Sequence, residues 1–455
     1  LQGLPRRTGK WGFGRRSKED ALIMKIVRTY KYRAYLSPDQ IKTLDRWFLL
    51  CRKLYNLCVE QRKSMYLRYN ECSVSSYEKD GEVKTSYSPR KYTSSFEQQK
   101  ELTLLRSEFP EFKEVACHLE QKIVDRVDQA FKKFYDNIKN YRSGKINDWP
   151  KEPKFKPWFK DFSLLCKEAT KFKLQILSNS KEPMARIYGI PSPRGHKDCP
   201  IKKGIKVRYH KSIDGKVLQQ LIKKEGQNWF LCVSVEKESA DINPSPNTVG
   251  IDLGIARTAQ LSDGQYRDLP YELLEELYER KKVLQRRLRN KKGGNRNKKE
   301  KQSKNYKRAY QRIAKIDRRI ANIKAYHLKM VATEIARNNS VVVVEKLNVK
   351  NMTKSAKGTV KDPGKKVKQK SGLNRKILLT NPSFFRGFLK QKCQEFGSVY
   401  IEVNPAYTSQ TCSKCSHVDK GSRLDQEHFE CTKCGFELNA DHNAAINILN
   451  KGLIK

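Results

Sequence analysis

Four cysteines near the C-terminal end of the sequence have the spacing of metal ligands. Cys412 and Cys415 form one CxxC pair, Cys431 and Cys434 form a second, and fifteen residues separate the two pairs. This pattern is typical of a zinc site built from two knuckles, in which four thiolates surround one ion. Because the four sulfurs complete the tetrahedron, no position is left for water or substrate. The sequence therefore predicts one structural zinc ion.

Three acidic residues occupy positions where carboxylates could bind a second kind of metal. Asp252 lies inside the apolar run VGIDLGI, Glu345 ends the run VVVVE, and Asp441 begins the last predicted helix. An unpaired carboxylate in an apolar strand is strongly destabilising, so a cation is the natural partner of Asp252. Each acid also has a purely structural interpretation. Asp252 could meet a buried arginine, Glu345 could face solvent, and Asp441 could cap the helix 442–450.

Taken together, the three acids match a ribonuclease-H-like metal site. Such a site combines an Asp from a first strand, an acid from the end of a later strand and an Asp from a final helix. It holds two Mg²⁺ ions about 3.5–4 Å apart, one that activates water and one that stabilises the leaving oxygen of a phosphodiester. Clustered carboxylates suit Mg²⁺ because this ion prefers hard oxygen ligands. Gly250 and Gly254 flank Asp252 and allow another backbone or a ligand to come close.

The overall charge points to a polyanionic partner. The chain has 455 residues with 95 Lys and Arg against 49 Asp and Glu, and 95 − 49 gives a formal net charge of +46. Such an excess is self-repulsive in a compact fold, which disfavours a free-standing metabolic enzyme and favours nucleic acid as the partner. No stretch approaches the roughly 18 apolar residues of a membrane span. Because the remaining cysteines stand singly, as reduced thiols do, we expect a soluble cytoplasmic protein, associated with the nucleoid if the cell is prokaryotic.

One segment concentrates this positive charge. Residues 281–320 contain 18 Lys or Arg and two acids, Glu300 and Asp317. Ion pairs within so one-sided a run cannot balance its charge. The segment is either a solvated, partly disordered loop or a nucleic-acid contact, and we favour the contact. The candidate phosphate-binding residues are Lys281, Lys282, Arg286, Arg287, Arg289, Lys291, Lys292 and Arg296.

In the N-terminal half of the chain, the pattern of apolar residues changes from helical to strand-like after about residue 161. Residues 24–36 have the Tyr, Val and Ile content of a strand with one solvent-facing side. Ser37 and Gln40 have the spacing of a capping box, which predicts a helix after residue 37. A second helical pattern covers 115–141, and a polar Ser- and Lys-rich link separates the two helices. Short alternating segments in 162–240 then predict a small antiparallel sheet or barrel, completed by the first strand.

The C-terminal half alternates strands and helices around the candidate chemistry. Two strands are predicted within 248–264, followed by a long helical hairpin over 270–339. The further predicted elements are a strand at 341–345, a mobile basic loop at 350–376, a helix at 382–396, a strand at 398–403 and a closing helix at 439–452.

These elements predict a multidomain protein of the α+β and α/β classes. The expected parts are a basic arm or remnant at 1–23, a small sheet or barrel from 24–37 and 162–240, a helical module at 38–161, and a domain at 241–455 that carries the candidate metal ligands, with a zinc ribbon at 406–437.

The motifs around the acids and cysteines resemble those of TnpB proteins. The segments that carry the likeness are GIDLGI, VVVVEKLNVKNM, NPAYTSQTCSKC and FECTKCGFELNADHNAAINIL, with weaker support from KIVRTYKYRAYLSPDQ and PKFK. TnpB proteins are RNA-guided DNA endonucleases encoded by insertion sequences and related to compact type V CRISPR effectors. The resemblance implies that 241–455 is a ribonuclease-H-like (RuvC-like) nuclease domain with an inserted zinc ribbon. It also implies that 24–37 and 162–240 form a wedge β-barrel domain and that 38–161 is a helical recognition domain. The implied partners are a guide RNA and a double-stranded DNA target with a short flanking motif.

The resemblance also assigns roles to single residues. Asp252, Glu345 and Asp441 would be the catalytic ligands of two Mg²⁺ ions, and the four cysteines would hold zinc. Arg423 would bind the scissile phosphate, although an arginine that only pairs with a ribbon acid is an alternative. The basic segment 350–376 would be a lid near the active site. The sequence departs from the family pattern at Ser416, where glycine is common, and at the two residues before Asp441.

Two other functional classes share the same residues. A transposase or recombinase with this metal fold would join strands as well as cut them. A guided DNA-binding regulator would bind without cutting, and it is usually recognised by the loss of one acid. All three acids are present here. The sequence therefore favours an RNA-guided endonuclease.

Overall fold

The computed structural model describes residues 25–67, 72–79, 82–89, 93–146, 148–157, 162–167, 169–178, 182–196, 198–239, 243–255, 257–291, 302–359, 362–425 and 427–454. Two compact units divide the chain, one of them Lys25–Glu238 and the other containing Ser239–Lys455. No helix in the described ranges is long and apolar enough to cross a membrane.

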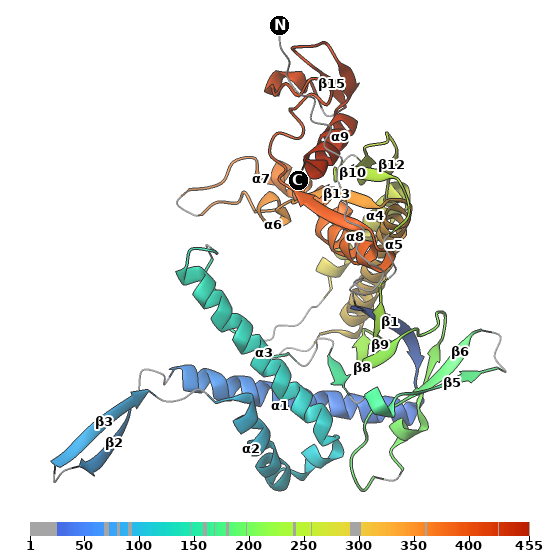
Figure 1. Ribbon diagram of the computed structural model, residues 1–455. Helices are drawn as coiled ribbons and strands as arrows, with labels where there is room; N and C mark the ends of the chain where they lie inside the picture. The colour runs from blue at the N-terminus through green and yellow to red at the C-terminus, as the bar shows by residue number, and fades with distance from the viewer. Residues whose placement is uncertain are drawn as a thin grey trace, which may run out of the picture. The chain divides into compact units, whose positions relative to one another are not determined.

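The unit Lys25–Glu238 is built on a seven-stranded antiparallel sheet with the order β4-β8-β9-β1-β7-β6-β5 (Figure 1). β1 pairs with β9 over ten residues and with β7 near its end, so the prediction that the first strand completes the later sheet is confirmed. Closure of this sheet into a barrel stays a prediction. The strands are β1 (Lys25–Tyr35), β4 (Ser163–Cys166), β5 (Lys173–Leu177), β6 (Met184–Tyr188), β7 (Ile205–Arg208), β8 (Lys216–Glu225) and β9 (Asn228–Glu238).

Helices are inserted between β1 and β4. The capping box is confirmed, because the Ser37 hydroxyl accepts from the Gln40 amide and the Gln40 side chain accepts from the Ser37 amide. The predicted polar link is wrong in part, since it contains a hairpin and a helix. The inserted elements are α1 (Pro38–Leu67), β2 (Cys72–Lys79), β3 (Glu82–Pro89), α2 (Ser95–Glu108), the short helix η1 (Pro110–Glu114) and α3 (Cys117–Arg142), and two further short helices, η2 (Ala169–Lys171) and η3 (Pro200–Lys203), follow within the sheet region.

The helices and the sheet share one hydrophobic core. Phe48 of α1 contacts Trp229 of β9, with 5.2 Å between ring centroids, and contacts Phe162 near β4 at 6.0 Å. Buried residues of α3, such as Phe131, belong to the same cluster as Tyr32 of β1. A shared core does not test the division into a recognition domain and a wedge domain, and this division stays a prediction.

The unit that contains Ser239–Lys455 has a five-stranded mixed sheet with the order β12-β11-β10-β13-β14. β10, β13 and β14 are parallel to one another, whereas β11 and β12 run antiparallel. The run VVVV is buried because helices cover both faces of its strand. The strands are β10 (Thr248–Asp252), β11 (Ala259–Leu261), β12 (Tyr266–Arg267), β13 (Val341–Glu345) and β14 (Val399–Val403).

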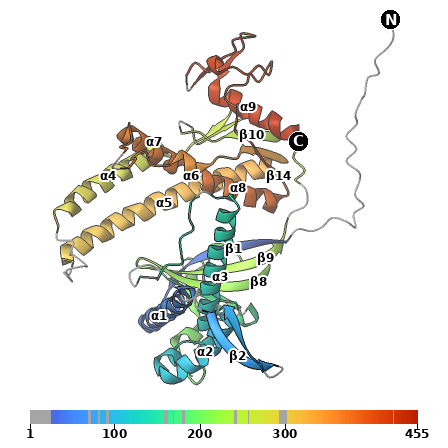
Figure 2. The same cartoon turned by 90° about the vertical axis from the view of Figure 1, so that its left-hand side faces the viewer.

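Alternate residues of the central strands point to opposite helix layers. Val342 and Val344 pack with residues of α5 and α8, whereas Val343 packs with Ile448 of α9. Figure 2 shows α9 on the side of the sheet opposite α5 and α8. The unit is thus a mixed α/β layered fold. Its helices are α4 (Tyr271–Arg289), α5 (Lys304–Asn338), α6 (Val349–Met352), α7 (Val367–Thr380), α8 (Pro382–Phe396) and α9 (Ala440–Leu453).

The prediction of a loop over 350–376 is wrong at both ends, because α6 extends to Met352 and α7 begins at Val367. The Lys370 ammonium donates to the Met352 carbonyl at 2.8 Å, and the Asn374 amide donates to the Thr353 carbonyl at 3.0 Å. These bonds join α7 to the end of α6. Composition missed the helix because its lysines can satisfy backbone carbonyls as well as repel one another.

Candidate active site

Two of the three candidate acids end neighbouring parallel strands. Asp252 is the last residue of β10, and Glu345 is the last residue of β13. The register pairs Ile251 with Val344, which puts the two acids side by side at the carboxyl edge of the sheet. Ligand sites in such sheets commonly lie at this edge.

The third acid comes from α9. The N-cap of this helix is Asn439, whose side-chain oxygen accepts from the amides of Asp441 and His442 at 3.1 and 3.2 Å. The alternative in which Asp441 is the N-cap is therefore wrong. Because Asp441 lies inside the first turn, its carboxylate is not used by the cap. It also gains from the positive end of the helix dipole.

A glycine sets the distance between α9 and the sheet. A Cβ at Gly250 would lie 2.2 Å from the Ala445 carbonyl oxygen of α9. A Cβ at Gly452, at the other end of α9, would meet Val343 at 2.5 Å. The helix thus rests directly on the strand backbone, as the glycines around Asp252 suggest. This close seating brings Asp441 to the end of β10.

The raised pKa values of the three acids indicate that their carboxylates lie near one another. Burial raises the pKa of Asp252 to about 7, and the nearby charges of Glu345 and Asp441 add to the rise. Burial also raises the pKa of Glu345, against a hydrogen bond from Thr408 and the charge of Lys451. Burial raises the pKa of Asp441 in the same way, against Arg423. Carboxylates that raise the pKa values of their neighbours are stabilised by a bound cation.

Arg423 contacts the candidate site directly. Its Nη2 donates to Asp441 Oδ1 at 3.1 Å, while its Nε donates to the Asp425 carbonyl. The arginine therefore stands beside the acids, and its partner is Asp441 itself. Arg257 adds a second positive charge that lowers the pKa of Asp441.

Thr408 and two asparagines were missed at the sequence level. The Thr408 hydroxyl donates to Glu345 Oε1, and both side chains are buried. Asn447 of α9 donates to the Thr408 and Thr411 carbonyls, and Asn443 donates to the Thr411 carbonyl at 2.8 Å. The three residues fix the segment that leads into the cysteine region. They lie inside the quoted motifs, but their spacing carries no signal for a contact with Glu345.

The donor chemistry of the three acids fits Mg²⁺, since carboxylate oxygens are its preferred protein ligands. The acids are nevertheless more widely spread than the cysteines. Among the described residues, the four cysteines are the group whose ligand atoms all lie within 4.8 Å of one another.

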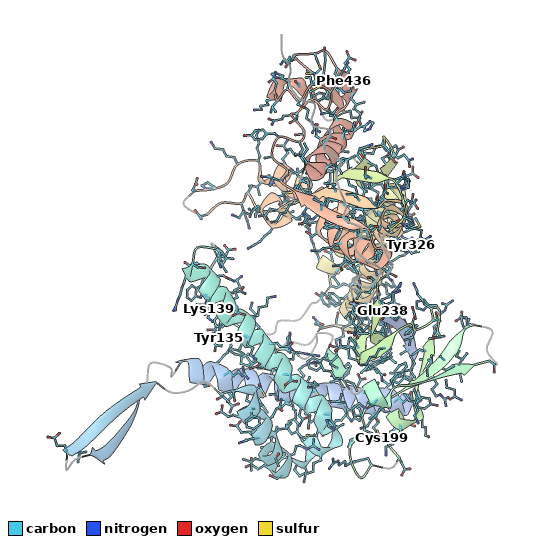
Figure 3. All side chains as sticks on the ribbon, in the orientation of Figure 1. Tyr135, Lys139, Cys199, Glu238, Tyr326 and Phe436 are labelled. Carbon is cyan, nitrogen blue, oxygen red and sulfur yellow. The ribbon has the colours of Figure 1, made fainter. Side chains whose placement is uncertain are left out.

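The cysteines form a compact four-sulfur cluster. The Sγ atoms of Cys412 and Cys434 are 3.8 Å apart, and those of Cys415 and Cys431 are 3.6 Å apart. Four sulfurs tetrahedral about zinc at about 2.3 Å would be about 3.8 Å apart, so the cluster fits one ion. Phe436, labelled in Figure 3, packs against it. The strands β15 (His428–Glu430) and β16 (Glu437–Asn439) and the short helix η4 (Lys420–Ser422) complete the ribbon.

The basic residues of the predicted hairpin lie on α4 and beyond its end. Lys281 pairs with Asp317 at 2.5 Å, and Lys282 pairs with Glu279. Thus one of the two acids in the run does balance a lysine. Arg286, Arg287 and Arg289 are exposed and make no ion pair with a described residue. Lys291 follows α4, and Lys292 and Arg296 lie outside the described residues.

Three family models match separate parts of the chain. They are a Cas12f1-like TNB domain over residues 383–448, a probable transposase family (OrfB_IS605) over 230–356, and a helix-turn-helix domain of OrfB_IS605 proteins over 24–71. The first two contain Glu345, Asp252 and Asp441 between them. In the described part of 24–71 the structure has one strand and one long helix, so the name of the third model does not describe its local fold.

Known relatives cover different shares of the chain. An Escherichia coli protein named "Putative RNA-guided DNA endonuclease InsQ" is 36% identical over 249 residues, which is 54% of this chain and 60% of the relative. A Streptomyces pristinaespiralis "Putative RNA-guided DNA endonuclease" is 24% identical over 95% of this chain and 91% of its own length. The "TnpB-like protein L79" of Acanthamoeba polyphaga mimivirus is 24% identical over 94% of this chain and 74% of its own length. The motifs, the family models and these relatives agree in their likeness to TnpB and OrfB_IS605 proteins, and the chain spans 60% of the length of the InsQ relative.

Proposed function

We propose that this chain is an RNA-guided, Mg²⁺-dependent DNA endonuclease. The observation that carries the proposal is the convergence of Asp252, Glu345 and Asp441 from two parallel strands and one helix. Glu345 is buried and Asp252 and Asp441 are partly buried. The pKa values of all three stay raised even though Arg423 contacts Asp441, so a bound cation would stabilise the group. The names of its relatives, which describe RNA-guided DNA endonucleases, support the same activity.

We further propose that the nuclease unit is ribonuclease-H-like, in the RuvC manner. Numbered within this unit, the strand order is 3-2-1-4-5, with the first three strands antiparallel and the last two parallel to the first. An acid ends strand 1, another ends strand 4, and the third opens the helix that lies on strand 1. The four cysteines would hold one zinc ion that stabilises the ribbon without taking part in the chemistry.

The chain's own residues position the reaction. When bound, two Mg²⁺ ions would activate the attacking water and stabilise the leaving oxygen of the phosphodiester. Asp252, Glu345 and Asp441 would hold these ions, and Thr408 orients Glu345 through its hydroxyl. Arg423, already within hydrogen-bond distance of Asp441, would bind a phosphate oxygen when the DNA strand enters.

The test is cleavage of a guide-matched DNA in Mg²⁺, beside a gel shift with the same complex. Sequencing of the RNA that copurifies with the protein supplies the guide. We expect Glu345→Ala to bind the DNA and to leave it intact. Strand transfer by purified protein with transposon ends would instead support the transposase class, and binding without cleavage by the wild-type protein would support the regulator class.

A further inference from the structure

The unit Lys25–Glu238 contains a groove that the proposed chemistry does not use. Its volume is about 540 Å³, and it lies between α1, α3 and the extended segment 151–157. Four lysines line it, at positions 133, 151, 154 and 156, together with the aromatic side chains of Tyr55, Phe134 and Phe155. Tyr55 and Phe134 are buried, so Phe155 is the lining ring that a base could reach. An exposed ring among cations is typical of single-stranded nucleic-acid sites.

The segment on one side of the groove is held by its backbone. The Asn56 side chain of α1 accepts from the Lys156 amide at 2.7 Å and donates to the Lys156 carbonyl at 3.2 Å. The Phe155 ring is 45% exposed even though its neighbours are fixed. The Lys63 ammonium lies 5.4 Å from the centre of this ring. An aromatic ring kept exposed beside a cation is ready to receive another flat group.

α3 forms the other side. Lys133, Asn137 and Tyr141 follow one another at four-residue steps and therefore share one face of the helix. Tyr141 contacts Trp149 edge to face, with 5.1 Å between ring centroids, and the Trp149 ring is 57% exposed. Tyr141 lies in the last turn of α3, beyond Lys139, which Figure 3 labels on this helix.

The charges of the groove are available to a ligand. Lys133, Lys151 and Lys154 are exposed and make no ion pair with any described residue. The neighbouring acid, Glu152, is already paired with Lys63 at 3.1 Å. These three lysines thus present positive charge to a ligand.

We propose that this groove binds single-stranded nucleic acid, with an unpaired base stacked on Phe155 and its phosphates on the lysines. The proposal rests on the proposed function only in that nucleic acid is the partner. A duplex keeps its base faces stacked inside, so exposed rings select for an unpaired base. An acidic peptide would use the lysines but would gain nothing from the exposed rings.

The experiment is photocrosslinking of the full-length protein to short oligonucleotides that contain 5-iodouracil, without added divalent metal. Single-stranded DNA, single-stranded RNA and duplex DNA form separate arms, and mass spectrometry locates the crosslinked peptides. We expect crosslinks within residues 149–157 from a single strand and none there from the duplex. The arm with the higher yield identifies DNA or RNA as the source of the base.

Matched variants separate stacking from packing. Phe155→Leu keeps an apolar side chain and removes the ring, so the yield at 149–157 should fall about tenfold, whereas Phe155→Tyr should retain it. Lys133→Gln with Lys154→Gln should lower the yield and weaken its salt dependence. Lys173→Gln with Lys206→Gln, which removes the same charge from exposed positions on β5 and β7, should leave it unchanged.

Three results would overturn the inference. The first is wild-type yield in Phe155→Leu, and the second is crosslinking that occurs elsewhere on the protein but not at 149–157. Equal displacement of the oligonucleotide by polyglutamate at matched charge would also show that the groove is only a cationic surface. If the protein cleaves guide-matched DNA but does not crosslink at 149–157, the groove inference is wrong and the proposed function stands. If it crosslinks at 149–157 but does not cleave, the groove inference stands and the proposed function is wrong.

Discussion

The Asp441 carboxylate does not cap its helix, because Asn439 does so, and it is hydrogen-bonded to Arg423 instead. Asn439 accepts the two amide hydrogen bonds at the start of α9, and Asp441 makes none of them with its carboxylate. In Asp441→Asn, the cap and the helix should therefore be intact. The loss of one anionic ligand should lower cleavage by orders of magnitude while guided DNA binding persists. The measurement is cleavage of guide-matched DNA beside a gel shift.

Asn439→Ala is the control for this prediction. It removes the cap and should cost about 0.5–2 kcal/mol of stability, with all three acids retained. We expect a lower melting temperature and measurable cutting at a temperature where the variant is folded. Near-wild-type cutting by Asp441→Asn would contradict the three-acid site and most of the nuclease proposal.

The raised pKa of Asp252 predicts how stability depends on pH. Burial and the charges of Glu345 and Asp441 raise its pKa to about 7, whereas an unfolded chain has an Asp pKa near 3.9. Between these values the folded state keeps a proton that the unfolded state has released. The stability of the metal-free protein should therefore fall as the pH rises from about 4 to 7.

Asp252→Asn tests this dependence because an amide cannot ionise. The drop in melting temperature of the metal-free protein between pH 5 and pH 8 should be smaller in the variant than in the wild type. Mg²⁺ should raise the wild-type melting temperature more at pH 8 than at pH 5, because binding requires the ionised acids. An equal drop in both proteins would remove Asp252 as the cause.

The sequence could predict the acids but not what surrounds them. Asp252 and Glu345 stand out because a carboxylate beside an apolar strand is unusual in itself. Thr408 gives no such signal, because a threonine reveals a partner only after β13 and the segment after β14 have come together. The N-cap at Asn439 was missed for a related reason. Both Asn and Asp are good caps, and the choice between positions 439 and 441 depends on where the strand β16 ends.

At the scale of elements, α9 must lie directly on β10 to deliver Asp441. Gly250→Ala would put a methyl group 2.2 Å from the Ala445 carbonyl oxygen, so helix or strand must move. We expect destabilisation of about 1–3 kcal/mol or more and a loss of cutting. Gly387→Ala is the control, because this glycine lies in α8 with open space where the methyl would be. It should be neutral or stabilising by up to about 1 kcal/mol. Similar melting temperatures for the two variants would contradict the close seating of α9.

The zinc ribbon is an element whose fold depends on its ion. Cys431→Ser should lower the zinc content from one ion per chain to none, because three thiolates hold zinc far more weakly than four. Limited proteolysis should then cut within residues 412–437 before other regions. Cys117→Ser, which removes an exposed thiol outside the ribbon, should keep one zinc. Elemental analysis measures the number of zinc ions per chain. Active wild-type protein without zinc would contradict the assignment of the four cysteines as a zinc site.

Some elements were predictable and others were not. β13 coincides with the run VVVVE, and α8 with the predicted helix 382–396, because their apolar patterns are strong and their ends are marked. The β2–β3 hairpin has a polar sequence, so its pairing is not visible as an apolar alternation. α7 was not predicted because its first turns are polar and rich in lysine, and its buried Ile377 comes only after them. Patterns of burial can be read from sequence, whereas pairing between polar segments cannot.

At the scale of the whole molecule, the net charge of +46 is unevenly available to a ligand. α4 shows this division within one helix. Its first half is acidic, and Lys281 and Lys282 at its centre are paired with Asp317 and Glu279. The three arginines that follow, at positions 286, 287 and 289, have no such partner among the described residues. Phosphate binding should therefore depend on the arginines more than on the two lysines.

Replacement of Arg286, Arg287 and Arg289 together by Gln tests this division. Each lost phosphate contact should reduce the slope of log affinity against log salt by about 0.9, so the triple variant should lose up to about 2.7 of the slope. Lys281→Gln with Lys282→Gln should change the slope less per charge, because these ammonium groups are already neutralised within the protein. Since phosphate contacts carry no sequence information, the choice of target should stay the same in both variants. A changed target preference with an unchanged salt slope would show that this helix reads bases and does not simply hold the nucleic-acid backbone.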